Sequence, residues 1–361
     1  MTHPPPRIVG TASRSRPPAS RRARATVVVL ASSALSWLLG LGLPTGLDAQ
    51  ELPAGPLPVA EQNPLYRLQH SPETEPVDVV GRGELVVGLI TAYSNVFEQS
   101  SSPRHAHLFD LEQMTNTLGA RYGVGDSWET GMELTFHTGW GGFLDGFVSG
   151  FHNAFGLPNG GRETEPEGQH EVRLAGLDPN VDLRLPSRTL DPEGISAFAK
   201  WQPFGVDRGA YGLSIRGTLR TSLGPLESGR VDAAVSLMGR LSGRGEFEGT
   251  HLYGSAMFVR LDPVSSLEPI FREGAMAFTL AFERGVTPGV AGIVQLSAGT
   301  PYVDAWDESR LSRFPSTLTF GIADRGEGDW GWRFGFTEDF PPESPTVDFT
   351  VNLGIRRRLA L

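Results

Sequence analysis

The stretch SWETGMELTFHTGWGGFLDGFVSGFHNAFGLPNGGR, residues 127–162, changes its periodicity once, near residue 141. In its first part, apolar side chains occupy the even positions and polar ones the odd positions: Trp128, Met132, Leu134 and Phe136 alternate with Glu129, Glu133, Thr135 and His137. A period of two predicts a β-strand with one apolar and one polar face.

The second part repeats phenylalanine every four residues, which predicts a short amphipathic helix over residues 141–156. Its apolar stripe consists of Phe143, Phe147, Phe151 and Phe155, whereas Asp145, His152 and Asn153 occupy other positions. Gly156 and Pro158 end the helix, because glycine accepts a left-handed C-terminal conformation and proline cannot continue the hydrogen-bond ladder. So broad an apolar face needs an apolar surface to lie on.

Strand-like runs separated by turn signals fill the rest of the chain from residue 83, and no longer helical pattern occurs. Twelve candidate strands cover residues 83–95, 107–122, 127–138, 194–203, 209–223, 230–242, 246–261, 274–284, 290–300, 315–324, 329–338 and 346–359. Strands of about ten residues, apolar on one face and polar or small on the other, are typical of a transmembrane β-barrel with lipid outside and water inside. A soluble β-sandwich is the alternative, since its strands alternate too.

Connection lengths favour the barrel. Short links at 123–126, 204–208, 243–245, 285–289 and 325–328 alternate with other links, most of them longer, at 96–106, 139–193, 224–229, 262–273, 301–314 and 339–345. Outer-membrane barrels have short periplasmic turns and longer outer loops. Tryptophan and tyrosine gather beside the short links, where a barrel has an aromatic girdle: Tyr122, Trp128, Trp201, Tyr211, Trp330 and Trp332. We therefore predict an all-β fold, an antiparallel transmembrane β-barrel of about 12 strands over residues 83–361, with the helix in the long outer loop 139–193.

The N-terminus has the layout of a secretory signal. Residues 1–24 contain six arginines and no acid, and an apolar run over 26–43 precedes Leu47, Asp48 and Ala49. This predicts a signal peptide over residues 1–49, cleaved after Ala49, and an outer-membrane location for the mature protein. An uncleaved membrane anchor is the alternative, because the apolar run is near the lower length limit for spanning a bilayer.

Composition excludes several classes of function. Cleavage would leave 25 basic and 40 acidic side chains, a net charge of −15, so nucleic acid is not an expected partner. Cysteine is absent, which removes disulfides and thiolate chemistry. Residues 50–82 are rich in proline and acid and predict an extended periplasmic arm. We expect its Asn63-Pro64-Leu65-Tyr66 segment to pack into or against the barrel mouth, because an apolar island in a polar arm needs cover.

Three parts of the chain resemble a known bacterial family. They are Asn63-Pro64-Leu65, the strand from Gly83, and above all the run FHNAFGLPNGGR over residues 151–162 with GFLD before it. The chain resembles the domain of unknown function numbered thirty-one eighty-seven, and the likeness covers nearly all of the mature chain. The resemblance implies an exported envelope protein and brings no activity, cofactor or catalytic residue.

The predicted interior carries charges of both signs and suggests a small-solute channel or transporter. The candidate pathway residues are Arg216, Arg220, Arg240, Arg333, Arg356, Glu129 and Glu133. Such a wall selects solutes by charge and screening. We expect the helix residues Phe143, Phe147, Phe151, His152, Phe155 and Arg162 to form a constriction against the inner wall or rim. The competing placement is flat in the outer leaflet with the phenylalanines toward lipid.

Two other functions stay open. An outer-membrane lipid hydrolase would need a serine–histidine pair, but Ser214, Ser222, Ser236 and His137 all fall on the polar side of their strands. A structural or assembly role is the other alternative. We expect no metal site, since His105 and His107 fall short of a ligand set, and no cofactor. The expected partners are outer-membrane lipid, the barrel-assembly machinery that recognises a terminal strand, and a solute that the sequence does not identify.

Overall fold

The computed structural model describes eleven parts of the chain. These are residues 53–70, 74–156, 159–177, 180–205, 210–224, 229–262, 270–304, 310–325, 328–340, 344–347 and 349–361. The expected signal peptide, 1–49, lies outside the described residues.

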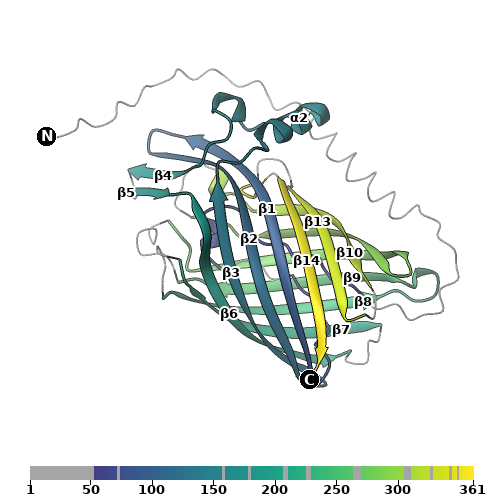
Figure 1. Cartoon of the computed structure of the whole chain (residues 1–361). Helices are drawn as coiled ribbons and strands as arrows, with labels where there is room; N and C mark the ends of the chain where they lie inside the picture. The colour runs from purple at the N-terminus through teal and green to yellow at the C-terminus, as the bar shows by residue number, and fades with distance from the viewer. Residues whose placement is uncertain are drawn as a thin grey trace.

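Twelve antiparallel strands form a closed barrel, which confirms the predicted fold class. Closure comes from β1, which pairs with β2 along one edge and with β14 along the other. The barrel strands are β1 Glu84–Ser101, β2 His105–Gly125, β3 Trp128–Trp140, β6 Arg188–Phe204, β7 Tyr211–Ser222, β8 Val231–Ser242, β9 Thr250–Arg260, β10 Gly274–Thr287, β11 Val290–Gly299, β12 Ser316–Asp324, β13 Trp330–Asp339 and β14 Phe349–Ala360. Figure 1 shows them tilted around the interior.

Strands β1 and β2 are longer than predicted and reduce the expected loop 96–106 to residues 102–104. Their pairing continues to Ser101 opposite Ala106. The extra residues form strand because both faces find partners: on the inward face Phe109 is buried and His107 Nε2 lies 3.2 Å from Glu98 Oε1, and on the other face Phe97 is buried beneath Arg162 of the long loop.

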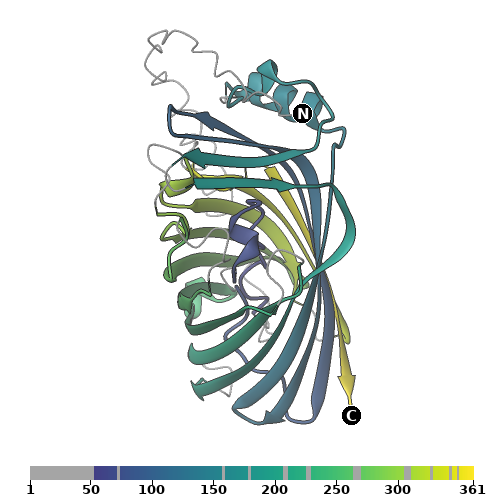
Figure 2. The ribbon, with the colours of Figure 1, turned by 90° about the vertical axis from the view of Figure 1, so that its left-hand side faces the viewer.

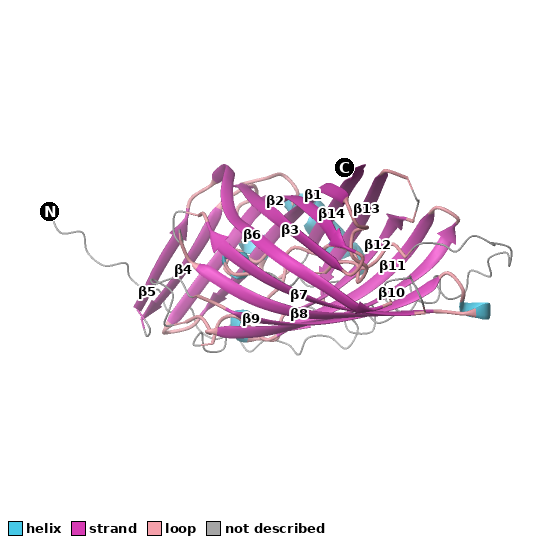
Figure 3. Cartoon of the chain, turned by 90° about the horizontal axis from the view of Figure 1, so that it is seen from below, coloured by secondary structure: helices cyan, strands magenta, loops and turns pink. Residues whose placement is uncertain are grey.

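The long loop after β3 contains a hairpin that the sequence analysis missed. Strands β4, Glu171–Leu177, and β5, Asn180–Leu185, pair with each other, and β4 also pairs with β2 over residues 105–110. Alternating valine and leucine in both strands was the available signal. Seen from below, this hairpin lies at the opposite side of the barrel from β10 and β11 (Figure 3).

The same loop carries helix α2, Asp145–Phe155, which begins four residues later than predicted. Gly142 has a φ of 77°, and a Cβ there would collide with the Glu112 side chain. The Glu112 carboxylate accepts the backbone N–H groups of Phe143 and Leu144, so it satisfies donors at the helix start. Short 3₁₀ turns are η1 Tyr66–Leu68, η2 Arg162–Thr164, η3 Gly245–Phe247 and η4 Arg310–Ser312. Within the described parts of the chain, no helix has the length and apolar character needed to cross a membrane.

The two ends of the barrel differ. The C-terminus lies at the end with the connections 126–127, 205–210, 243–249, 288–289 and 325–329, called here the short-turn end; α2 lies at the other, the long-loop end (Figure 1). The rings of Trp128 and Trp201 stack 5.8 Å apart on the outward surface beside the short turns.

Apolar and polar faces are inverted relative to a soluble sandwich. On β7, the outward Leu219 is 59% exposed, whereas the inward Arg216 is 2% exposed. On β10, the outward Leu280 is 54% exposed, whereas Glu283 is fully buried. A sandwich buries its apolar faces between two sheets, so this arrangement excludes that alternative.

Candidate functional site

The described part of the N-terminal arm, residues 53–70 and 74–80, lies inside the barrel rather than beside it (Figure 2). It rises first along β10, β11 and β13. The backbone N–H groups of Ala54 and Gly55 donate to Glu283 at 3.1 and 3.0 Å, and the N–H of Leu57 donates to Gln295 Oε1 at 3.0 Å. Arg333 donates to the carbonyl oxygens of Pro56, at 3.0 Å, and Ala54. Polar wall residues therefore satisfy the arm's backbone inside the lumen.

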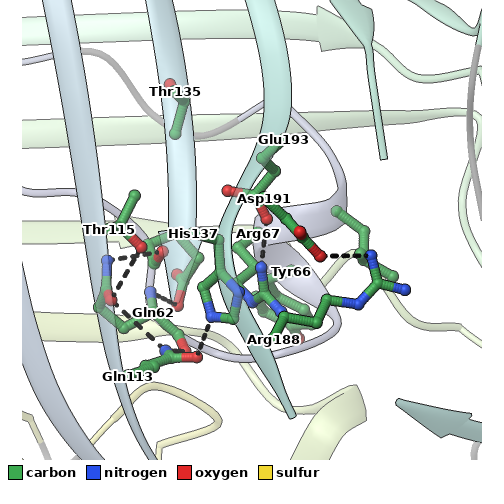
Figure 4. A network of polar contacts seen from close by, with 12 residues as sticks. Gln62, Tyr66, Arg67, Gln113, Thr115, Thr135, His137, Arg188, Asp191 and Glu193 are labelled. Carbon is green, nitrogen blue, oxygen red and sulfur yellow. Dashed lines mark hydrogen bonds and ion pairs between the residues drawn. The ribbon is translucent and has the colours of Figure 1, made fainter. Parts of the chain in front are cut away.

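At the long-loop end, the arm turns through η1 and is held on several sides (Figure 4). Gln62 bonds to Gln113 and Thr115 of β2, and Gln113 Oε1 lies 3.3 Å from His137 Nε2. Arg67 forms an ion pair with Glu193 of β6.

Further contacts hold the same turn to the loops. Tyr66 Oη donates to the carbonyl of Leu311 at 2.6 Å, and Tyr302 Oη donates to that of His70 at 2.9 Å. The turn at the top of the arm is therefore anchored to both wall and loops.

The arm then descends along β6, β7 and β8 to join β1. The Glu75 carboxylate lies 3.0 Å from Arg216 and 3.5 Å from both Arg121 and Lys200. Below it, Asp78 pairs with Arg240, and the N–H of Val80 donates to Glu129 Oε2 at 2.7 Å. The acids of the returning arm thus neutralise cations of the wall.

One half of the wall holds the arm by apolar packing as well. Ala54, Leu57 and Val77 lie in a buried cluster with Met238, Tyr253, Ala281, Ala291, Ile293 and Ala323 of β8–β12. Leu65, Tyr66 and Leu68 lie in a second cluster at the long-loop end, which includes residues of β1, β2, β4, β5 and β8–β10 and of the loops there. Each fully buried leucine contributes on the order of 2 kcal/mol. The arm is therefore seated firmly on the β8–β12 half.

The other half of the wall leaves a cavity of about 260 Å³ between itself and the arm. Its wall lining comes from β1, β2, β3, β6, β7, β13 and β14, and includes Thr115, Thr117, Gly119, Thr135 and Ser196. Arm residues line the opposite side: Pro58, Val59, Ala60, Glu61, Arg67, Gln69, His70, Thr74, Glu75 and Pro76. The cavity runs along the lumen beside the arm, and its lining combines charged and hydroxyl side chains with apolar ones such as Val86 and Ile90.

The seven predicted pathway residues all face the interior, but in different roles. Arg216, Arg220, Arg333, Arg356 and Glu133 line the cavity. Arg240 and Glu129 instead hold the arm near the short-turn end. The sequence analysis missed Glu75, Asp78, Lys200, Glu283 and Gln295, the last three of which stand at inward positions of their strands.

Helix α2 does not lie in the lumen, as the expected constriction would. Phe143 and Phe147 are 78% and 57% exposed, and the Phe147 ring packs edge-on, 6.1 Å from Phe349 at an outward position of β14. Phe151 is half-buried, and the side chain of Phe155 lies outside the described set. This geometry corresponds to the competing placement, with the aromatic face directed away from the barrel interior.

The polar face of α2 is the one that the protein covers. Asp145 accepts hydrogen bonds from Asn95, at 2.9 Å, and from Arg162. His152 and Arg162 are both buried, and Arg162 lies over the Phe97 ring at 4.7 Å. Arg162 therefore joins the loop to β1 instead of facing a pathway.

One serine–histidine contact among the described residues joins Ser242 of β8 to His251 of β9. Ser242 Oγ lies 2.9 Å from His251 Nδ1, but Arg325 faces Nε2 at 3.1 Å. Because arginine only donates, Nε2 accepts and Nδ1 carries the hydrogen, so His251 cannot take a proton from Ser242. Among the residues that the structure describes, no group of three or more histidine, aspartate or glutamate side chains could hold a metal ion.

Comparison with known proteins identifies one matching family and several similar solved structures. A family described as "Protein of unknown function (DUF3187)" matches residues 46–359, which confirms the resemblance drawn from the sequence. The COG4313 outer membrane channel from Pseudomonas putida F1 superposes with a TM-score of 0.50 at 11% identity, covering 80% of this chain and 100% of that one. The NanC porin gives 0.41 at 6% identity, covering 76% and 100%, and the KdgM porin 0.39 at 6%, covering 75% and 98%. No curated protein matches. The first likeness shows the fold.

Proposed function

Since the chain belongs to the DUF3187 family of proteins of unknown function, whose description supplies no activity, we propose from the lumen itself that the protein is an outer-membrane channel for small hydrophilic solutes. The outward surface supports the membrane location. Apolar side chains on it and aromatic residues beside the short turns match a barrel whose outer wall meets lipid.

The observation that carries the proposal is the asymmetric filling of the lumen. One buried apolar cluster packs the arm onto β8–β12, and a cavity of about 260 Å³ lies between the arm and the wall formed by β13, β14, β1, β2, β3, β6 and β7. In this proposal the arm is a fixed partition, and solutes pass between it and the polar half of the wall.

The proposal can be tested with a substitution that narrows the cavity without replacing a charged residue. A Cβ at Gly119 would lie 3.6 Å from Glu133 Cγ and 3.9 Å from the Met132 carbonyl oxygen, both ordinary contacts. A leucine at this position therefore projects into the cavity without displacing the strand. Gly217 of β7 is the matched control, since it faces outward and nothing lies within 4 Å of its Cβ position.

The measurement is single-channel conductance in planar bilayers of protein refolded from residue 50 onward. We expect channels in the unmodified chain, a clear fall in conductance with Gly119→Leu, and no change with Gly217→Leu. A variant lacking residues 50–70 should conduct more, because the partition is then incomplete. Folded wild-type and arm-deleted proteins that both fail to raise the bilayer current above background would overturn the proposal.

A further inference from the structure

One row of paired residues around the polar half of the wall contains three positions without side chains. Arg356 of β14 pairs with Gly331 of β13 on one side and with Gly88 of β1 on the other, and Gly88 pairs with Gly119 of β2. All four residues line the cavity. They form a shallow bay, the Arg356 bay, with a half-buried guanidinium and a floor of backbone.

Gly331 is required for this shape. A Cβ at Gly331 would lie 2.5 Å from Arg356 Nε, so any larger residue would push the arginine out of its position. Farther along the same row, Gly119 pairs with Glu133, and Glu133 with Ser196. The bay therefore opens sideways onto a carboxylate and a hydroxyl across the cavity.

Most other arginines that line the cavity have a carboxylate partner that compensates their charge. Arg216 is compensated by Glu75 and Glu133, Arg220 by Asp232, and Arg67 by Glu193.

Arg356 forms no hydrogen bond or ion pair with the described residues. The N–H donors of its guanidinium are therefore available to a molecule in the cavity. Its neighbour Arg333 donates to backbone carbonyls of the arm and pairs with no carboxylate of the described residues. Positive charge thus gathers on the β13–β14 side of the cavity.

We propose that the Arg356 bay binds the carboxylate group of a small organic monoanion. A guanidinium presents a planar fork that matches a carboxylate in a bidentate geometry. The glycine floor leaves room for the group beside the strand backbone. Glu75 and Glu133 in the same cavity disfavour ions of higher negative charge, and the volume of about 260 Å³ restricts the remainder of the molecule to a small one.

This inference rests on the proposed function, since it names the class of solute that the channel carries. The probe is propionate, with propionamide as its neutral counterpart of the same shape. Ligand-observed NMR on the refolded protein in detergent measures binding without reference to conduction. Block of the potassium chloride current by each probe in planar bilayers measures the effect on the pathway.

The variants are Arg356→Gln, Arg356→Lys and, as control, Arg357→Gln, whose guanidinium faces outward over the Trp330 ring at 5.3 Å. We expect Arg356→Gln to weaken propionate binding and block about tenfold or more, as loss of a charge-assisted pair implies. Arg356→Lys should weaken them less, because it keeps the charge and loses the fork. Arg357→Gln should behave as wild type, and propionamide should not bind.

The outcomes separate the two proposals. Equal propionate binding by wild type and Arg356→Gln, or equal binding of propionamide, overturns the bay. Propionate binding that depends on Arg356, in a protein that forms no channels, leaves the bay standing and overturns the proposed function.

Discussion

Glu75 of the arm lies 3.0 Å from Arg216 of β7, and this ion pair is the centre of the arm's attachment to the polar half of the wall. The same carboxylate lies 3.5 Å from Arg121 and Lys200, so one acid is shared by three cations, of which Arg216 and Lys200 are buried. Removing one partner of a buried pair is costly, typically about 3–5 kcal/mol, because the remaining charges lose compensation. The arm therefore compensates wall charges inside the lumen as well as filling part of it.

Replacement of Glu75 should make the channel more selective for anions. In Glu75→Gln, Arg216 keeps Glu133, but the cluster gains one net positive charge inside the cavity. The reversal potential under a tenfold salt gradient should shift toward the chloride equilibrium potential. Glu84→Gln is the control, because Glu84 is about one-third exposed and pairs with Arg358 at the short-turn end. An unchanged reversal potential in Glu75→Gln would show that ions do not pass this cluster.

A cross-link should show whether the arm is a fixed partition. Leu57 Cδ1 lies 3.3 Å from the position that a Cβ on Gly335 would occupy, so side chains at 57 and 335 meet, and a disulfide between cysteines placed there tests this contact. The chain has no cysteine of its own, so the single variants are clean controls. We expect the disulfide to form on oxidation of the folded protein, visible by mobility on non-reducing gels.

The conductance of the cross-linked protein should equal that of its reduced form. If instead oxidation closes the channel and reduction reopens it, the arm must leave its seat on β8–β12 for solutes to pass. Rapid labelling of the single Leu57→Cys variant by a bulky water-soluble maleimide would contradict the placement of Leu57, which is 1% exposed inside the barrel.

Probes on α2 should distinguish its two faces. A fluorophore on Phe147→Cys should be quenched by lipid-soluble quenchers, since Phe147 is 57% exposed and packs on the outward residue Phe349. Val148, the next residue, is 2% exposed, and the same label on Val148→Cys should be protected or should disrupt the loop. Quenching of the 147 label by water-soluble reagents alone would place the helix over the pore.

The alternation of apolar and polar residues was sufficient to predict the barrel. In 209–223 and 346–359, inward and outward positions follow from parity alone, and the predicted strands correspond to β7 and β14. Parity also placed Arg216 and Arg356 inside the barrel. A pattern of this kind is local, because each residue's direction is fixed by its position in its own strand.

The path of the arm could not be predicted in this way. Ala54 bonds to Glu283, which is 229 residues away, and Leu57 to Gln295, which is 238 residues away. An extended segment has no periodicity, so nothing in residues 53–80 indicates which wall it contacts. The available hint was chemical: acids in the arm, Glu75 and Asp78, face a wall whose inward cations are in excess.

The face by which α2 docks was misjudged for a related reason. Its four phenylalanines suggested a face that protein must cover, but lipid can cover it equally well. The buried contacts come instead from Asp145, which needs partners because an isolated carboxylate inside protein is costly. Only the fold shows that Asn95 and Arg162 stand within reach of it.

Arg162 should therefore hold the long loop against β1. Its loss should make the loop more mobile without unfolding the barrel. Arg162→Ala removes the bonds to Asp145 and Asn95 and the contact with the Phe97 ring. The carboxylate of Asp145 would keep only Asn95 and the N–H of Gly168, at 2.8 Å. Breaking such a buried pair costs about 3–5 kcal/mol, which exceeds what a single loop segment can lose and remain docked.

Limited proteolysis of the folded protein in detergent measures this directly. Cleavage within residues 141–170 should be much faster in Arg162→Ala than in wild type, whereas the resistance of the barrel to denaturation on gels should be unchanged. Glu163→Ala is the matched control, because the adjacent side chain is exposed and should leave cleavage at the wild-type rate. Since Arg162 lies outside the cavity lining, single-channel conductance should stay at the wild-type value. A higher conductance in Arg162→Ala would instead show that the loop obstructs the pathway, as the constriction hypothesis requires.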